Sequence, residues 1–259
     1  MRIVRYRGTD GPAWGVLGDD DRVRAANGAP FDGLVSGDDV GGLADLDLLA
    51  PATPSKVICV GRNYREHAAE FNNPIPEEPL LFMKPPSSVI GPGAEIHYPS
   101  LSKRVDPEAE LVLVIGREAH RVPADRAMEV IGGYICGNDV TARDIQKSDG
   151  QWTRGKGFDT FCPIGPWIET ELDPSDLRVT CTVDGELRQD GRTADLIFPI
   201  PDLIEYISRF TRLLPGDLIM TGTPEGVAPM EVGQTVVVEV EGIGRLENRL
   251  VNEPAGPVT

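Results

Sequence analysis

The chain of 259 residues alternates between short apolar runs and turn-forming segments along most of its length. Such runs predict strands, and we place them at 2–6, 13–17, 57–60, 80–83, 109–115, 134–138, 179–183, 217–220 and 235–240. Helical patterns are fewer, at 65–70, 124–131, 139–146 and 200–210. Because no regular β–α alternation appears, a Rossmann fold and a TIM barrel are disfavoured. The pattern predicts a mixed α+β fold with few short helices, built on a β-sandwich or β-roll.

The first fifty or so residues form a separate part of this pattern. Short alternating runs at 2–6 and 13–17 are followed by a polar stretch around Asp19-Asp20-Asp21, and Pro51-Ala52-Thr53-Pro54 then interrupts the chain. We therefore expect a small N-terminal β-rich domain over 1–53 and a main domain over 54–259.

The charge balance excludes several classes of partner. The chain has 25 Lys and Arg against 41 Asp and Glu, a formal net charge of −16. Such a chain repels nucleic-acid phosphates and anionic membrane surfaces, so we expect neither partner. No apolar run is long enough to span a bilayer, and the four cysteines form no C-x-x-C pair. These features predict a cytoplasmic protein with buried free thiols, in which an anionic substrate needs a locally positive site.

Three carboxylates stand out from the many acids. Glu108 and Glu110 flank the start of the 109–115 run, so a strand with a period of two directs both to one face. Asp139 follows another apolar segment, 133–138, where a strand would end. Together they offer an oxygen-rich site suited to Mg²⁺ or Mn²⁺ rather than to zinc. Taken alone, an exposed acidic edge explains the Glu-x-Glu pair equally simply.

A second pair has the arrangement of a general base. His67 and Glu70 are spaced i, i+3 on the short helical segment 65–70, which makes them neighbours on one side. A carboxylate that orients an imidazole and stabilises its protonated form suits proton transfer. A surface ion pair is the alternative interpretation of the same spacing.

Further polar residues could serve an acidic substrate. Asp139, Arg143 and Gln146 fall at i, i+4 and i+7, one stripe of the helix expected over 139–146, where Arg143 could hold a carboxylate beside a metal. Lys156 lies between two glycines and could add a second positive group. The segment 217–227 is a strand that enters a Gly-rich turn, which suits either an anion contact or an ordinary β-turn.

Taken in order, these segments resemble the fumarylacetoacetate hydrolase family from about Lys56 to Glu253. The resemblance is carried by Val60–Tyr64 with His67 and Glu70, Leu81–Pro85, Glu108–Leu111, Gly133-Tyr134, Asn138–Asp144, Lys156–Pro166, Gly216-Asp217 and Thr221–Pro224. It implies that Glu108, Glu110 and Asp139 bind Mg²⁺ or Mn²⁺, with Ca²⁺ as a substitute in crystals. It implies that His67 and Glu70 are a catalytic dyad on a lid, assisted by Lys156. Arg143, Gln146, Lys156 and Thr223 are then substrate contacts, and a β-roll core and a homodimer are expected.

The resemblance implies small 2-oxo or 2,4-dioxo acids as substrates and a metal-stabilised enolate as the shared intermediate. The favoured expectation is acylpyruvate-type C–C hydrolysis, with oxaloacetate decarboxylation beside or in place of it. The alternative is an isomerase of the 2-hydroxyhepta-2,4-diene-1,7-dioate type, which moves a proton along a conjugated diacid. An alternative of another class is a non-catalytic β-rich protein that holds a structural metal, which leaves His67, Glu70 and Lys156 without a task.

Overall fold

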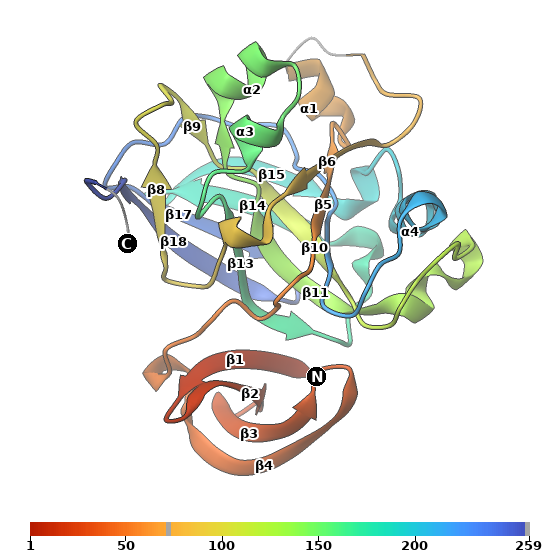
Figure 1. The fold of residues 1–259 in the computed structure, drawn as a ribbon, viewed down its shortest axis with the longest axis vertical. Coiled ribbons are helices and arrows are strands. Elements are labelled where there is room, and N and C mark those ends of the chain that lie inside the picture. The colour runs from red at the N-terminus through yellow and green to blue at the C-terminus, as the bar shows by residue number, and fades with distance from the viewer. Residues whose placement is uncertain (71–73, 257–259) are drawn as a thin grey trace.

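The computed structural model describes residues 1–70 and 74–256, which form eighteen strands and four α-helices (Figure 1). The strands are β1 (Arg2–Gly8), β2 (Gly11–Leu17), β3 (Arg22–Ala29), β4 (Asp32–Gly42), β5 (Val57–Gly61), β6 (Leu80–Lys84), β7 (Val89–Ile90), β8 (Glu95–Tyr98), β9 (Val105–Asp106), β10 (Ala109–Ile115), β11 (Ile131–Asn138), β12 (Thr141–Ala142), β13 (Cys162–Glu169), β14 (Arg178–Val183), β15 (Glu186–Arg192), β16 (Leu218–Met220), β17 (Thr235–Val240) and β18 (Gly244–Asn252). The helices are α1 (Arg65–Glu70), α2 (Arg143–Asp149), α3 (Thr153–Lys156) and α4 (Ile200–Phe210).

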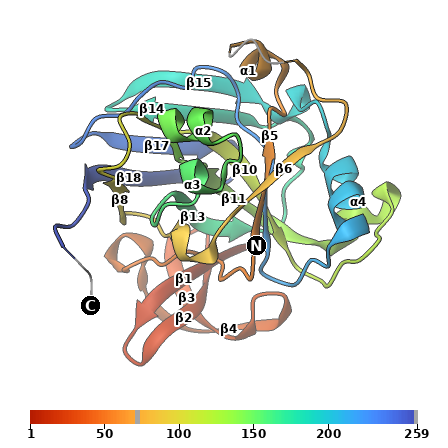
Figure 2. The same cartoon turned by 45° about the horizontal axis from the view of Figure 1, so that its top comes forward.

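Two large sheets organise these strands. An eleven-stranded mixed sheet has the order β4-β3-β2-β1-β13-β11-β10-β16-β5-β6, with β7 paired to β13. A five-stranded sheet has the order β15-β14-β17-β18-β8, and β12 and β9 form a two-stranded ribbon. Figure 2 shows β14, β15, β17 and β18 side by side, with β1–β4 apart from them. The predicted fold class, mostly β with few short helices and a small N-terminal β-rich part, is confirmed.

The main core lies between the two sheets, and β10 passes through its centre. Leu111, Leu113 and Ile115 belong to the core cluster that also contains the inward side chains of β14 and β17. Val112 and Val114 point the other way, into a second cluster. Both faces of β10 are therefore buried, which explains why its sequence is continuously apolar rather than alternating.

Helix α4 closes one side of the main core. Its apolar residues Ile200, Leu203, Ile204 and Ile207 recur at i, i+3, i+4 and i+7, and all four are buried in the main cluster. This period places one face of the helix against the sheet. The helix begins and ends where the pattern predicted.

The N-terminal strands extend the large sheet instead of standing free of it. Arg2 pairs with Glu169 and Ile3 with Ile168, which joins β1 to β13. Ile3 is completely buried in the second cluster, beside Ile164 and Ile168. β3 and β4 were not predicted, because their sequences are polar and rich in glycine and lack an apolar alternation.

Two predicted helices differ from the structure. Residues 124–130 form a 3₁₀ helix, and the helix expected over 139–146 begins only at Arg143. Thr141 and Ala142 instead pair with Asp106 and Val105 as the β12–β9 ribbon, and the Arg143 amide donates to the Arg104 carbonyl over 2.8 Å. Asp139 and Arg143 therefore do not share a helical face, and that part of the prediction is wrong.

All four cysteines are buried and free, as predicted. Within residues 1–70 and 74–256, no helix is long and apolar enough to cross a membrane.

Candidate active site

Three buried carboxylates meet where β10 begins and β11 ends. Ala109 lies opposite Asn138 in this antiparallel pair, so Glu108 faces Asp139, whose amide donates to the Glu108 carbonyl over 2.8 Å. Glu110 is two residues farther along β10. One ligand oxygen of each of Glu108, Glu110 and Asp139 lies within 4.8 Å of the others. We call these residues the carboxylate triad; strand pairing assembles it, as the period of two suggested.

Cationic side chains surround two members of the triad. Lys156 Nζ donates over 2.6 Å to Glu108 Oε2 and over 2.6 Å to Asp139 Oδ2. The Arg143 guanidinium donates to Glu108 Oε1 from the other side. Lys156 is completely buried in α3, so its ammonium is held in place by the two carboxylates. The triad is thus partly neutralised by the chain itself.

The pKa values of the two glutamates diverge because their neighbours differ. Burial raises the pKa of Glu110 well above its usual range, and the adjacent charges of Asp139 and Glu108 raise it further. Burial acts in the same direction on Glu108, but Lys156 and Arg143 outweigh it and hold the pKa of Glu108 below its ordinary value. Glu110, whose Oε2 accepts a 2.7 Å hydrogen bond from the Gly222 amide, is therefore the position at which a cation would relieve most repulsion.

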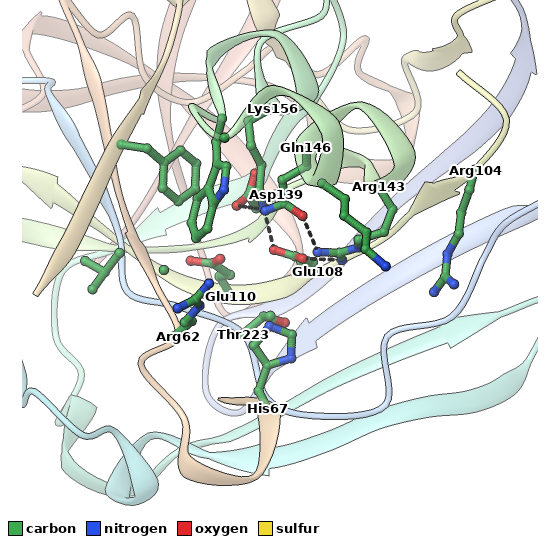
Figure 3. Close-up of a pocket in the computed structure, with 16 residues that line it drawn as sticks. Arg62, His67, Arg104, Glu108, Glu110, Asp139, Arg143, Gln146, Lys156 and Thr223 are labelled. Atoms are coloured by element: carbon green, nitrogen blue, oxygen red, sulfur yellow. Dashed lines mark hydrogen bonds and ion pairs between the residues drawn. The ribbon is translucent and has the colours of Figure 1, made fainter. Parts of the chain in front are cut away.

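The triad forms part of the wall of a cavity of about 460 Å³, drawn in Figure 3. Its wall also contains seven polar or charged residues labelled in Figure 3: Arg62, His67, Arg104, Arg143, Gln146, Lys156 and Thr223. A cavity of this size suits a small molecule. Every site residue predicted from the sequence except Glu70 lines it.

His67 and Glu70 are paired as their spacing predicted. His67 Nδ1 lies 3.2 Å from Glu70 Oε2, and the second oxygen of Glu70 accepts a 3.3 Å hydrogen bond from the Gly226 amide. The carboxylate therefore touches both the imidazole and the loop after β16. His67 is buried and faces the cavity, whereas Glu70 stands behind it.

Arg143 and Gln146 also meet, as the predicted stripe required of these two residues; only Asp139 lies off the helix. Arg143 Nη1 donates to Gln146 Oε1 over 2.8 Å, a contact between neighbours at i, i+3 on α2. Arg143 Nε donates over 2.9 Å to the buried carboxylate of Asp106. The guanidinium is thus oriented by three side chains at the edge of the cavity.

Thr223 reaches the cavity from the loop after β16. Gly222 has a φ of 106°, and a Cβ there would come within 2.8 Å of Asn63 Cβ, so only glycine lets this loop approach the turn between β5 and α1. Thr223 Oγ1 accepts a 2.7 Å hydrogen bond from Gln189 Nε2. The Gly-rich segment therefore presents a backbone amide to Glu110 and a hydroxyl to the cavity.

The family model described as fumarylacetoacetate (FAA) hydrolase C-terminal matches residues 56–251, and a second, described as Rv2993c-like N-terminal, matches residues 1–51. The chain belongs to the fumarylacetoacetate hydrolase family. This confirms the resemblance drawn from the motifs.

Three relatives within the family illustrate what the fold supports. A solved structure of 5-carboxymethyl-2-hydroxymuconate delta-isomerase from Mycobacterium smegmatis is 47% identical, with a TM-score of 0.90 over 98% of this chain and 100% of that one. Human oxaloacetate tautomerase FAHD2A is 42% identical over 80% of this chain and 70% of its own length. Fumarylpyruvate hydrolase from Pseudomonas aeruginosa, solved with Mn²⁺ and pyruvate, is 38% identical, with a TM-score of 0.73 over 77% of this chain and 91% of that one.

The donor set of this family member fits a hard divalent cation. Asp139 Oδ1 is buried and accepts no hydrogen bond within the described residues, although Lys84 Nζ lies 2.7 Å from it. The reason is that Lys84 donates instead to the carbonyls of Val140, Lys156 and Phe161, which satisfies its three N–H groups. A buried carboxylate oxygen that accepts no hydrogen bond, next to Glu108 and Glu110, completes a set of oxygen donors of the kind that Mg²⁺ or Mn²⁺ prefers.

Three supporting residues were missed by the sequence reasoning. Lys84 lies in a quoted motif, but nothing near it in sequence marks it as a partner of Asp139. Asp106 continues the spacing of Glu108 and Glu110 by two residues, a signal that could have been used. Gln189 joins the Ala109 amide, over 2.9 Å, to Thr223 and the Pro224 carbonyl, and its polar strand offers no signal at all.

Proposed function

We propose that this chain is a metal-dependent enzyme that forms and protonates the enolate of a small 2-oxo acid. One observation carries the proposal: the buried carboxylate triad, within 4.8 Å, lies in the wall of a cavity that also contains a base and cationic side chains. A non-catalytic metal site does not account for His67 and Lys156 at the same cavity, or for the Glu70 carboxylate that contacts His67.

Each group then has a chemical task. Mg²⁺ or Mn²⁺ held by the carboxylate triad would act as a Lewis acid for negative charge that develops on the 2-oxo oxygen. Arg143 binds the substrate carboxylate, because its planar guanidinium matches two carboxylate oxygens. Lys156 supplies positive charge to the same region, and Thr223 offers a hydroxyl.

His67 is the residue to which we assign proton transfer. Its Nδ1 is oriented by Glu70, and its Nε2 takes the proton from C3 of the acid. The electrons of the broken C3–H bond form the C2–C3 double bond, and the 2-oxo oxygen becomes the enolate oxygen. Return of the proton to oxygen or to another carbon completes a tautomerisation or an isomerisation.

Proton transfer of this kind is the reaction we favour. It needs only the groups already described, and the isomerase and tautomerase relatives, at 47% and 42% identity, have names that describe such a step. The second candidate is C–C hydrolysis, in which His67 would activate water to attack C4, or decarboxylation of oxaloacetate through the same enolate. The His67–Glu70 pair and the fumarylpyruvate hydrolase relative favour that second candidate.

A substrate panel tests the proposal. Purified protein with Mg²⁺ or Mn²⁺ is assayed for interconversion of the enol and keto forms of oxaloacetate, for isomerisation of the dienol diacid, and for pyruvate release from acetylpyruvate. We expect turnover that EDTA abolishes and that His67→Ala lowers by about 10²- to 10³-fold. His120→Ala, which changes an exposed histidine outside the cavity, is the matched control. Absence of metal-dependent turnover, or an undiminished rate in His67→Ala, would contradict the proposal.

A further inference from the structure

Arg62 adopts a conformation that needs an explanation. It follows β5 directly and has a φ of 57°, in the left-handed region that non-glycine residues seldom occupy. Such a conformation is energetically unfavourable for a residue with a Cβ and is concentrated at functional sites. Its side chain lines the cavity, and Figure 3 shows it on the opposite side of Glu108 and Glu110 from Arg143.

An aromatic platform holds the Arg62 guanidinium in place. The group lies 5.8 Å from the centroid of the Trp152 ring, within the range of a cation–π contact. Gly61 makes room for that ring, since a Cβ at this position would lie 2.5 Å from it. Phe82 packs edge-on against Trp152 with centroids 5.2 Å apart. A guanidinium that contacts the face of a ring in this way keeps N–H groups that can donate to a ligand in the cavity.

Arg62 also differs from the other arginines of the cavity in its partners. Arg104 and Arg143 both donate to Asp106, and Arg143 donates to Glu108 as well. Within residues 1–70 and 74–256, the Arg62 guanidinium forms no ion pair. A strained, stacked and unpaired arginine at a cavity wall is placed to bind an anion from solution.

The charge balance of the wall supports more than one anionic group on the ligand. If Arg104 is assigned to Asp106, four cationic side chains remain against the carboxylate triad: Arg62, Arg143, Lys147 and Lys156. A divalent cation on the triad would enlarge this positive excess beyond what one substrate carboxylate neutralises.

We infer that Arg62 binds a second carboxylate of the substrate, so that the site takes 2-oxo dicarboxylic acids in preference to 2-oxo monocarboxylic acids. This inference rests on the proposed function and narrows its substrate class. The first carboxylate goes to Arg143, and the second, at the other end of the molecule, meets the guanidinium edge over Trp152. Arg62 is then a specificity-determining residue.

Equilibrium binding of matched pairs of 2-oxo acids tests this without relying on turnover. Calorimetry in the presence of Mg²⁺ compares 2-oxoglutarate with 5-methyl-2-oxohexanoate, and 2-oxoadipate with 6-methyl-2-oxoheptanoate, in which an isopropyl group replaces the distal carboxylate. We expect the wild type to bind at least one diacid about 10- to 100-fold more tightly than its isostere. Arg62→Gln should remove that preference and change the affinity for the monoacid by less than about threefold, while Arg62→Lys should keep part of it.

The matched control is Arg121→Gln. Arg121 is also an arginine in the left-handed region, with a φ of 55°, but it is exposed and lies outside this cavity. The Arg121→Gln variant should leave the preference for diacids intact. The comparison then separates loss of the contact between Arg62 and the ligand from the effect of replacing an arginine in the left-handed region.

The outcomes also separate the inference from the proposed function. A preference for diacids that is lost in Arg62→Gln supports the inference even if no acid is turned over, in which case only the proposed reaction fails. Turnover of 2-oxo acids without any preference at either chain length overturns the inference alone. A preference that persists in Arg62→Gln overturns it as well, and loss of that preference in Arg104→Gln would instead assign the second carboxylate to Arg104.

Discussion

A negative charge on Glu110 is little compensated by the chain itself. Glu108 and Asp139 each contact Lys156, whereas the pKa of Glu110 is raised by burial and by those two like charges. Removing its charge should therefore leave the metal-free protein as stable as the wild type or more so, because repulsion in a buried site is relieved. The same change removes a ligand oxygen from the proposed cation site.

Calorimetric melting of Glu110→Gln checks both consequences at once. We expect Mn²⁺ at a hundred times its dissociation constant to stabilise the wild type by about 2.7 kcal/mol. Glu110→Gln should lose this stabilisation by Mn²⁺. In EDTA its melting temperature should not fall below that of the wild type. Glu247→Gln, on an exposed position of β18, should behave as the wild type. An Mn²⁺ response retained in Glu110→Gln would remove Glu110 from the ligand set.

Asp106 is expected to position Arg143 without touching the substrate. It is completely buried and accepts from Arg104 Nε and Arg143 Nε, each over 2.9 Å. In Asp106→Asn the guanidinium of Arg143 keeps Glu108 as a charged partner but loses the charge of Asp106, so KM for a 2-oxo acid should rise about 10-fold while kcat changes less. Asp190→Asn, which affects the exposed pair with Arg178, is the control. Equal losses in kcat and kcat/KM would argue that Asp106 acts on the reaction step itself.

At the residue scale, the sequence predicted contacts between site residues that are close to one another along the chain. Glu108 with Glu110, and His67 with Glu70, follow from the periods of a strand and a helix. Lys84 and Gln189 do not, because their partners Asp139 and Ala109 lie far away in the sequence and only the folded sheet brings them together. A single sequence, read on its own, contains no signal for such contacts.

At the scale of elements, Asp217 fixes the entry to the main domain. Its buried carboxylate accepts from Ser55 Oγ over 2.6 Å, from Lys56 Nζ over 2.5 Å and from the Leu214 amide over 2.8 Å. It thus ties the segment before β5 to the turn before β16, which pairs with β5 in parallel. Asp217→Asn breaks a charged pair and should lower the free energy of unfolding by about 3 kcal/mol.

The pH dependence of this effect has a defined sign. Burial raises the pKa of Asp217, but the contacts with Lys56 and Ser55 outweigh it and leave the pKa below its ordinary value. The stabilisation is therefore complete above the unfolded-state pKa of about 3.9 and is lost as the pH falls through the lower folded-state pKa. Urea unfolding at several pH values should show the two proteins converging below about pH 4. Asp176→Asn, on an exposed ion pair, should show little difference at any pH. A difference that stays constant down to low pH would assign the effect to packing.

The one-sided apolar period of α4 and the continuous apolar run of β10 were predicted well, whereas several elements that depend on pairing were not. α4 and β10 have their predicted bounds because burial dictates their side chains directly. The helix expected from Asp139 begins four residues later, since pairing of Thr141 and Ala142 with β9 takes precedence over the local helical pattern. The polar strands β3, β4 and β15 have no apolar alternation, so nothing in their sequence distinguishes them from loops.

At the scale of the whole molecule, the distribution of charge reconciles an acidic protein with an acidic substrate. The net charge of −16 belongs to the chain as a whole, whereas cationic side chains outnumber carboxylates in the cavity wall. Figure 1 places the helices α1, α2 and α3 around this site at the end of the molecule away from β1–β4. The N-terminal strands therefore lie away from the proposed reaction site. We expect them to contribute to the stability of the fold.

The single sheet predicts that the N-terminal strands and the main domain unfold together. Ile3 is completely buried between β1 and β13, in the cluster that also contains Val112 of β10. Truncation of this side chain in Ile3→Ala should lower the free energy of unfolding by about 3 kcal/mol. The melting temperature of one common transition should then fall by roughly 5–10 °C. Differential scanning calorimetry checks this, with Val35→Ala, an exposed residue of β4, as the control that should not shift it. If calorimetry shows two transitions and only the first moves in Ile3→Ala, residues 1–53 unfold on their own, as two separate domains with the predicted boundary at residue 53 would.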